Sequence, residues 1–369
     1  MAFSTIPTAG LSTGGANFRN LIINGDMSIA QRSTSEASKG ADPGYFTVDR
    51  MYYFENGTTD VRFTQSQSTD VPSGQGFASS IKFDCTTADA SLATDNQLVL
   101  KHRLEGQNLQ QIKFGTSSAE SLTLSFWIKS TKTGTFIVEL SREGSRKISK
   151  SYTVSSSDTW EKKTLTFPPD TGGSGLSNDN GNRLEVNMYM GVGTNYSSGT
   201  LNTSWSAPSN TDRAVGQVNA FDSTSNNFYL TGVQLEVGTS ASDFEFLPYD
   251  VNLQRCQRYF EQTYAMGTAT GTATGTGSSR VSGTTDASSN ITYNQPFRVV
   301  KRTTPTITTY NASGTSGVWN YARSGASGTL STNDWTTNDK LVGLYWTVGG
   351  GWNFAIAQTE GHWVADAEL

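Results

Sequence analysis

The sequence predicts an all-β protein, in which a jelly-roll β-sandwich is followed by a short helix and a smaller C-terminal β domain. Three observations support this fold class. Charged residues make up only 16% of the chain, against roughly 25% in typical domains. The chain is rich in residues that favour strands and turns, with 37 Gly, 18 Phe, 14 Tyr and 8 Trp. Many segments also alternate apolar and polar residues, as a strand with one buried face does.

Residues 228–249 predict the strand that closes the sandwich and the loop that covers it. Residues 233–237 alternate apolar and polar side chains, the period of a half-buried strand. The apolar residues between 228 and 230 have the opposite parity, so the core-facing side changes near Gly232. A glycine at such a break is the usual sign of a β-bulge.

The sandwich is expected to span residues 20–249, preceded by an N-terminal arm. Residues 1–19 are small and polar, with Phe3, Ile6 and Leu11 as their few apolar anchors. Such an arm is either disordered on its own or ordered by docking on a partner, and both alternatives remain open.

Within the sandwich, residues 122–129 form the cleanest predicted strand, because four apolar residues alternate with four others. Residues 136–140 repeat this pattern after a turn at Gly134, so the two runs are predicted to form a hairpin. Residues 184–190 alternate in the same way. Roughly eight to ten strands are expected, a number and spacing typical of a jelly roll.

After Pro248 the alternation gives way to a helical period. Apolar residues recur every three or four positions in residues 251–262, and Asp250 is the predicted N-cap, so a linking helix is expected within 250–265. Residues 266–369 return to strand patterns and predict the C-terminal β-sandwich domain. Its first part is rich in Gly, Thr and Ala and predicts a flexible excursion or an edge hairpin.

Charge and hydropathy exclude several classes of partner. A formal net charge of −5 and the lack of a basic run argue against nucleic-acid binding. No segment approaches the ~18 apolar residues that a membrane helix needs. The N-terminus has neither the basic leader nor the apolar run of a secretory signal. We therefore expect no membrane insertion and no export by a signal peptide.

The sequence gives little support for catalysis, and we expect no enzymatic activity. It holds two histidines, His102 and His362, and no metal, triad or phosphate-binding motif. Glu139 and Glu185 both project from the polar sides of predicted strands, and a glycosidase needs only two carboxylates at ~5–10 Å. Any sandwich with this many strands would offer such a pair by chance.

No cofactor is expected. Jelly rolls can hold a structural calcium ion through loop carboxylates and backbone oxygens. Asp26, Asp84 and Asp243 could contribute to such a site, but no EF-hand-like spacing marks one.

Aromatic residues in polar surroundings are the best candidates for a binding site. Trp127 and Tyr189 project from the non-core sides of two strands, while Trp205, Trp319 and Trp335 lie in segments rich in Gly, Ser and Asn. Exposed rings can stack on the apolar faces of sugars, and loops on a rigid β scaffold often carry recognition residues. The alternative is that these rings pack under a neighbouring loop, a partner subunit or a small satellite core.

Seven stretches together resemble the tail proteins of bacteriophages, whose jelly-roll modules look like the carbohydrate-binding modules of glycoside hydrolases. The stretches are NLIINGDMSIAQR at 20–32, VDR at 48–50, LTLSFWIKSTKTGTF at 122–136, GVQLEVGTSASDFEFLPY at 232–249, CQRYFE at 256–261, FRVVKRTTPTITTY at 297–310 and WVADAEL at 363–369. One departure is Met51, because a tryptophan commonly follows the VDR-like motif in such modules.

The resemblance implies a virion structural protein that is assembled in the host cytoplasm. It would be a tail fibre or receptor-binding protein, a homotrimer that binds a host surface polysaccharide without catalysis. The N-terminal arm, with Phe3, Ile6 and Leu11, would attach it to other tail or head proteins of the virion.

Two alternatives to this reading remain. One is a head fibre, capsid decoration or tail connector protein that binds no sugar. The other is a glycan depolymerase, although dedicated phage depolymerases usually rely on long β-helices and no regular solenoid repeat is present.

Overall fold

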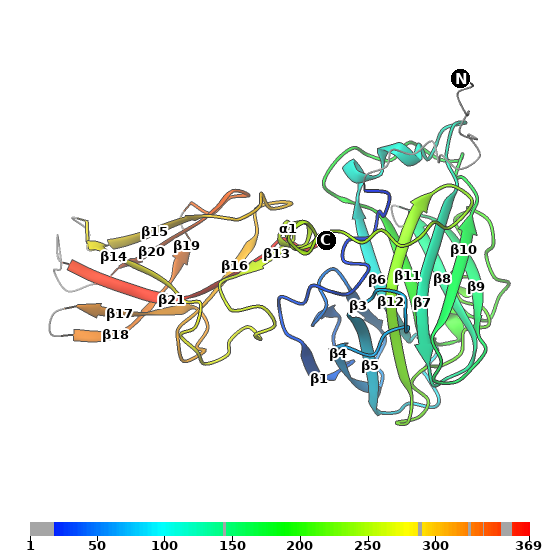
Figure 1. Cartoon of the computed structure of the whole chain (residues 1–369), viewed down its shortest axis with the longest axis horizontal. Helices are drawn as coiled ribbons and strands as arrows, with labels where there is room; N and C mark the ends of the chain where they lie inside the picture. The colour runs from blue at the N-terminus through cyan, green and yellow to red at the C-terminus, as the bar shows by residue number, and fades with distance from the viewer. Residues whose placement is uncertain (1–17, 143–144, 287–289, 324–325, 335, 348–355) are drawn as a thin grey trace, which may run out of the picture.

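The computed structural model describes residues 18–369 apart from 143–144, 287–289, 324–325, 335 and 348–355. Figure 1 shows two β lobes joined beside α1 (Tyr249–Gln257), which is the one α-helix among the described residues. The all-β prediction, with a jelly-roll sandwich followed by a short helix and a smaller β domain, is confirmed. In the described residues, no helix has both the length and the apolar character needed to cross a membrane.

The larger lobe consists of two six-stranded antiparallel sheets that pack face to face. Sheet A has the order β1 (Ser35–Lys39), β4 (Arg62–Ser68), β5 (Ser80–Thr87), β12 (Asn227–Val237), β7 (Leu122–Ser130) and β10 (Glu161–Phe167). Sheet B has the order β2 (Gly44–Tyr45), β3 (Tyr52–Asn56), β6 (Gln97–Glu105), β11 (Asn182–Val192), β8 (Gly134–Arg142) and β9 (Arg146–Val154). Short 3-10 turns occur at Gly106–Asn108, Gln110–Ile112, Thr194–Tyr196 and Asn210–Asp212.

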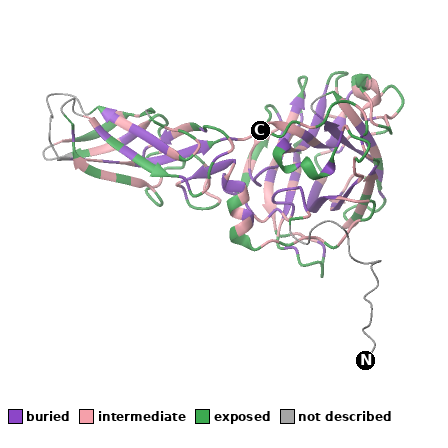
Figure 2. Ribbon diagram, turned by 90° about the horizontal axis from the view of Figure 1, so that it is seen from above, coloured by how far each residue is buried: buried purple, intermediate pink, exposed green. Residues whose placement is uncertain are grey.

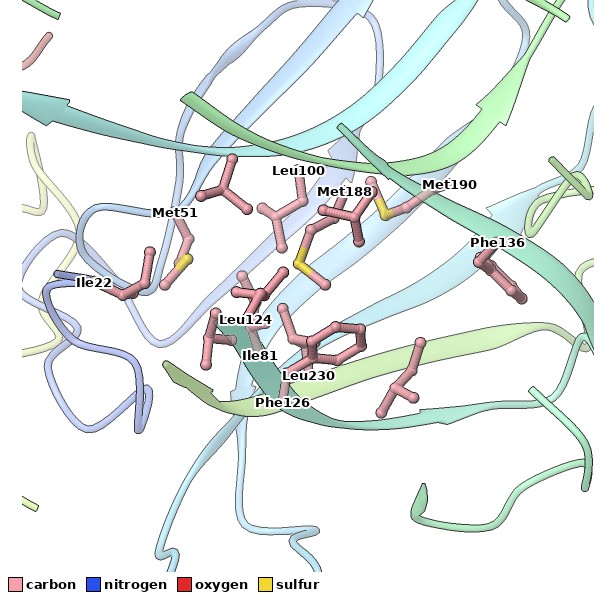
Figure 3. Packing of buried hydrophobic residues seen from close by; sticks show 14 of the residues in the cluster. Ile22, Met51, Ile81, Leu100, Leu124, Phe126, Phe136, Met188, Met190 and Leu230 are labelled. Carbon is pink, nitrogen blue, oxygen red and sulfur yellow. The ribbon is translucent and has the colours of Figure 1, made fainter. Parts of the chain in front are cut away.

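The core of this lobe lies between the two sheets, where the apolar sides of alternating strands meet. Figure 3 shows Leu100 and Met188 of sheet B opposite Leu124 and Phe126 of sheet A. Each such side chain contributes roughly 1.5–3 kcal/mol on full burial. Met51, which follows the VDR stretch at 48–50, is buried in the same core.

The predicted hairpin between residues 122–129 and 136–140 is wrong. β7 pairs with β10 and β12 in sheet A, whereas β8 pairs with β9 and β11 in sheet B. Both strands turn their apolar sides into one core, but from opposite sheets. Period-2 alternation reports which side is buried and says nothing about the partner strand.

The linking helix is shorter than the sequence pattern predicts. It ends at Gln257, and Phe260–Gln262 forms the strand β13 of the second lobe instead. Asp250 is not the N-cap: Pro248 holds that position, and Asp250 lies in the first turn. Its carboxylate there faces the positive end of the helix dipole.

The smaller lobe is built around its last strand, β21 (Ile356–Asp366), which pairs with four others. Those four are β13, β14 (Ser279–Thr284), β16 (Thr306–Tyr310) and β17 (Val318–Arg323), and β18 (Ala326–Ser331) extends the sheet. A second sheet consists of β15 (Asn290–Pro296), β20 (Leu341–Thr347) and β19 (Asn333–Asp334). Figure 2 shows buried residues in the strands of both lobes.

A buried charge cluster, which we call the joint, connects the lobes. Glu368, just after β21, forms ion pairs with Arg50 and with Arg32, at 3.1 Å from the latter. The guanidinium of Arg50 lies 3.5 Å from the ring centre of Tyr259, and that of Arg32 lies 3.6 Å from that of Phe260. Cation–π contacts of this kind are strongest when water is excluded.

Replacing Glu368 by glutamine should destabilise the protein by about 3–5 kcal/mol, because two buried guanidinium groups would lose a shared anion. The Glu368 side chain is only 7% exposed. The urea midpoint of unfolding measures this loss. Glu120→Gln is the matched control, since it breaks the exposed pair with Lys113 and should cost less than about 1 kcal/mol. Equal effects of the two variants would contradict the role given to the joint.

Glu55 on β3 should make stability fall as the pH rises. It is buried, and its Oε2 has no hydrogen-bond partner among the described residues. Burial raises the pKa of Glu55 from 4.5 to about 7, although nearby Arg62 opposes the shift. The folded state thus holds the proton more tightly than the unfolded state, and stability is lost between about pH 4.5 and 7. Glu55→Gln should remove this pH dependence, measured as the change in the urea midpoint of unfolding between pH 5 and pH 8. An equal change in the unmodified protein and in the variant would contradict the prediction.

Candidate ligand-binding site

The candidate site lies on the outer face of sheet A and depends on a bulge in its strand β12. The pairing of β12 with β7 slips between Thr231 and Gln234, and Gly232 has a φ of +61°. Phe228 and Leu230 enter the core before the slip, and Val233 enters it afterwards. The predicted β-bulge near Gly232 is therefore confirmed.

The bulge turns Gln234 and Glu236 outward, where they hold the following loop. The Ser242 backbone N–H and hydroxyl donate to the Glu236 carboxylate at 2.8 and 2.7 Å. The Glu245 N–H donates to Oε1 of Gln234 at 2.8 Å. These bonds fix the loop that carries Asp243, Phe244 and Phe246 over the sheet, so the loop is positioned by the strand before it.

This loop and the sheet enclose a pocket of about 330 Å³, which we call the aromatic pocket. It is lined by Gly74, Gln75, Phe77, Ser125, Trp127, Lys162, Gly232, Asp243, Phe244 and Phe246. The three phenylalanines form one cluster, with ring centres 4.8–5.1 Å apart. Trp127 lies on β7, with Lys162 of β10 and Thr231 of β12 beside it.

Gly232 lies beneath the rings of this pocket. A Cβ atom there would come within 2.6 Å of Phe77 Cζ and 3.1 Å of Trp127 Cδ1. The two rings thus lie over the same glycine, and together they form one apolar floor.

Four polar side chains in the pocket are free to bind a ligand. Gln75, Ser125, Lys162 and Asp243 have no side-chain hydrogen bond or ion pair with any residue that the structure describes. Ser125 is buried and the other three are exposed. Unpaired donors and acceptors beside a hydrophobic floor are typical of a small-molecule site.

Of the predicted binding aromatics, Trp127 alone lines the aromatic pocket. Trp205 is half-buried, packs on Phe114 at 5.2 Å and donates to the Pro168 carbonyl at 2.8 Å. Trp335 and the arm residues Phe3, Ile6 and Leu11 lie outside the described residues.

Two of the expected exposed rings are buried, so their prediction as surface aromatics is wrong. Trp319 lies on β17 rather than in a loop and stacks on Trp346 at 4.5 Å in the core of the smaller lobe. Tyr189 projects from the outer face of sheet B, but it packs under residues 193–218 with Ile137 and Ala214. For Tyr189 the alternative of a covering loop describes the structure.

Cationic side chains bind both carboxylates of the predicted pair. Glu139 is bound by the covering segment, residues 193–218, and Glu185 is bound by neighbouring lysine and arginine side chains. Arg213 makes two hydrogen bonds of 2.8 Å to buried Glu139. Burial alone would raise the pKa of Glu185, but Lys101 and Arg103 outweigh it and hold the pKa below its usual value. Each carboxylate is therefore engaged by a cation, whereas a general acid of a glycosidase has a raised pKa.

The three aspartates considered for calcium do not meet. Asp26 accepts a hydrogen bond from Asn252, Asp84 pairs with Lys82, and Asp243 lines the aromatic pocket. No group of three or more His, Cys, Asp or Glu side chains suited to a metal ion occurs in the described part of the chain.

Sequence reasoning missed most of the pocket, although two signals were present. Phe77 follows a short glycine-rich run, SGQG at 73–76, which marks a loop over the sheet. Phe244 and Phe246 alternate with acidic residues after the strand-ending Gly238, so large rings stand in a polar loop. Neither signal identifies the strand against which the ring will lie.

No protein-family model and no curated protein matches the chain. Some solved structures resemble it weakly. The enzymatically active domain of tailspike protein 4 from bacteriophage CBA120 is 15% identical, with a TM-score of 0.31 over 60% of this chain and 22% of that one. A protein from Bacteroides thetaiotaomicron described as sugar-binding is 11% identical, with a TM-score of 0.33 over 59% and 99% of the two chains.

A third similar structure is TmCBM61 bound to β-1,4-galactotriose, which is 11% identical with a TM-score of 0.29 over 59% of this chain and 99% of that one. An α-L-arabinofuranosidase is also similar, and the match spans 26% of its length. This chain therefore covers only about a quarter of the tailspike domain and of the arabinofuranosidase.

Gly232→Ala should disrupt the aromatic pocket and destabilise the protein more than an equivalent change at Gly74. Both glycines have a positive φ, +61° and +73°, so both variants strain the backbone. Only the Cβ at 232 meets neighbouring atoms, since nothing lies within 4 Å at Gly74. We expect a loss of about 1–3 kcal/mol beyond that of Gly74→Ala, measured by urea unfolding. Equal losses would show that the rings above Gly232 are not in contact with it.

Proposed function

We propose that this chain is a non-enzymatic structural protein of a bacteriophage virion that recognises a host surface glycan through the aromatic pocket. The observation that carries glycan binding is the apolar floor of Phe77 and Trp127 beside four free polar side chains. A pyranose ring matches this arrangement, because its C–H face is apolar and its edge bears hydroxyl groups. Aromatic rings supply large contact area for such a face at low entropic cost.

The virion role is supported by the seven stretches that resemble phage tail proteins. On this proposal the chain is a tail fibre or receptor-binding protein, assembles as a homotrimer in the host cytoplasm and attaches through residues 1–19. Glu139 and Glu185 are each bound to cations, which supports recognition without cleavage over a depolymerase.

A second candidate is a head fibre, capsid decoration or tail connector protein that binds no sugar. One observation favours it: five of the seven stretches contribute residues to the joint or its surroundings rather than to the pocket. Resemblance in those stretches therefore reflects a shared architecture, which proteins with different partners can use.

Removing a ring from the aromatic pocket should abolish glycan binding. Phe246 and Tyr249 are similarly exposed, 49% and 54%, but only Phe246 lines the pocket. We expect Trp127→Ala and Phe246→Ala to lose at least about 2 kcal/mol, roughly 30-fold in affinity, with Tyr249→Ala unchanged. A glycan array followed by titration calorimetry measures the loss, and assay of released reducing ends tests for cleavage.

Three results would contradict the proposal. Binding that survives both pocket variants would place the site elsewhere. Release of reducing ends by the purified chain would favour the depolymerase. Affinity for capsid shells without affinity for any glycan would favour the second candidate.

A further inference from the structure

We infer that the aromatic pocket selects an uncharged glycan and rejects polymers of acidic sugars; this inference rests on the glycan binding proposed above. The pocket contains one free cation, Lys162, and one free anion, Asp243. The fixed charge of the lining residues therefore sums to zero. A ligand that carries a carboxylate on every sugar would find one attractive and one repulsive group in the pocket.

The other lysines of this face are already neutralised. Lys129 lies 2.7 Å from Asp70 and 3.1 Å from Asp158. Lys82 lies 3.5 Å from Asp84. Among the described residues of sheet A's outer face, Lys162 is thus the single lysine without an anionic partner. A polyanion would have to break these pairs to gain further cationic contacts.

Long-range electrostatics also disfavour an acidic polymer. The chain has a formal net charge of −5, and the pocket itself contains the anion Asp243. Association with an anionic polymer is accelerated by a surface of one positive sign, and this face does not provide one. Repulsion from an acidic chain would act before contact, within a Debye length of ~8 Å at physiological salt.

The free polar groups suit hydroxyl groups instead. Gln75 offers both an amide donor and an acceptor, Ser125 offers a hydroxyl, and Asp243 accepts from O–H donors. Ser125 is only 4% exposed, at the base of the pocket. A neutral hydroxyl can satisfy this buried group at a lower desolvation cost than a carboxylate placed there.

Binding of the full-length chain to neutral and to acidic polysaccharides tests the inference. The neutral probes are β-1,4-galactan, mannan and β-glucan, and the acidic probes are alginate and polygalacturonate. We expect binding to at least one neutral polymer and to neither polyuronate. The dissociation constant should change by less than about twofold between low and high salt.

Two variants separate the contributions of charge and hydrogen bonding. Lys162→Ala removes one hydrogen-bond donor, so it should weaken binding of a neutral polymer by no more than about tenfold and should not change its salt dependence. Asp243→Ala should weaken binding about tenfold, because it removes an acceptor for hydroxyl groups.

Each other outcome has a defined meaning. Binding of a polyuronate that high salt or Lys162→Ala abolishes would overturn this inference and leave glycan recognition standing. Neutral binding that Asp243→Ala does not weaken would overturn the assignment of that acceptor. Failure to bind any polysaccharide would overturn the proposed function, and with it the inference.

Discussion

The change of side at Gly232 is the constraint on which both the core and the candidate site depend. Without the extra residue, a strand whose apolar residues have opposite parities in its two halves would leave one half facing water. The bulge lets both halves bury their apolar residues. It also brings Gln234 and Glu236 to the outside, where they hold the loop that walls the aromatic pocket. One backbone irregularity therefore links core packing to the candidate site.

The stretches that resemble phage tail proteins divide into two structural groups. Those at 122–136 and 232–249 supply Trp127, Gly232 and Phe246 to the aromatic pocket. Those at 20–32, 48–50, 256–261 and 363–369 supply Arg32, Arg50, Phe260 and Glu368 to the joint, and Arg302 of the stretch at 297–310 donates to the Glu368 carbonyl. These stretches thus have two structural roles in this chain: they form the buried ionic connection between the lobes and a strand–loop unit on sheet A.

The sequence predicts the fold well where a local pattern suffices and poorly where distant segments decide. Alternation identifies β7 and the bulge in β12, because both are properties of neighbouring residues. Alternation does not show that β7 and β8 belong to different sheets, because strand pairing depends on residues that are far apart in the sequence. It also misplaces Tyr189, because a period of two shows that a ring leaves the core but not that residues 193–218 will cover it. Trp127 and Tyr189 look alike in sequence and differ in what lies above them.

That difference distinguishes the outer faces of the two sheets. On sheet B, Arg213 hydrogen-bonds to Glu139 and the covering segment packs on Tyr189, so the ring of Tyr189 is closed to a ligand, although its hydroxyl and Asn187 Oδ1 have no hydrogen-bond partner among the described residues. On sheet A, Ser125 stays buried without a side-chain partner among the described residues, beside rings that remain partly accessible. The outer face of sheet A, where rings stay open beside unpaired polar side chains, is therefore the face on which we propose that a ligand binds.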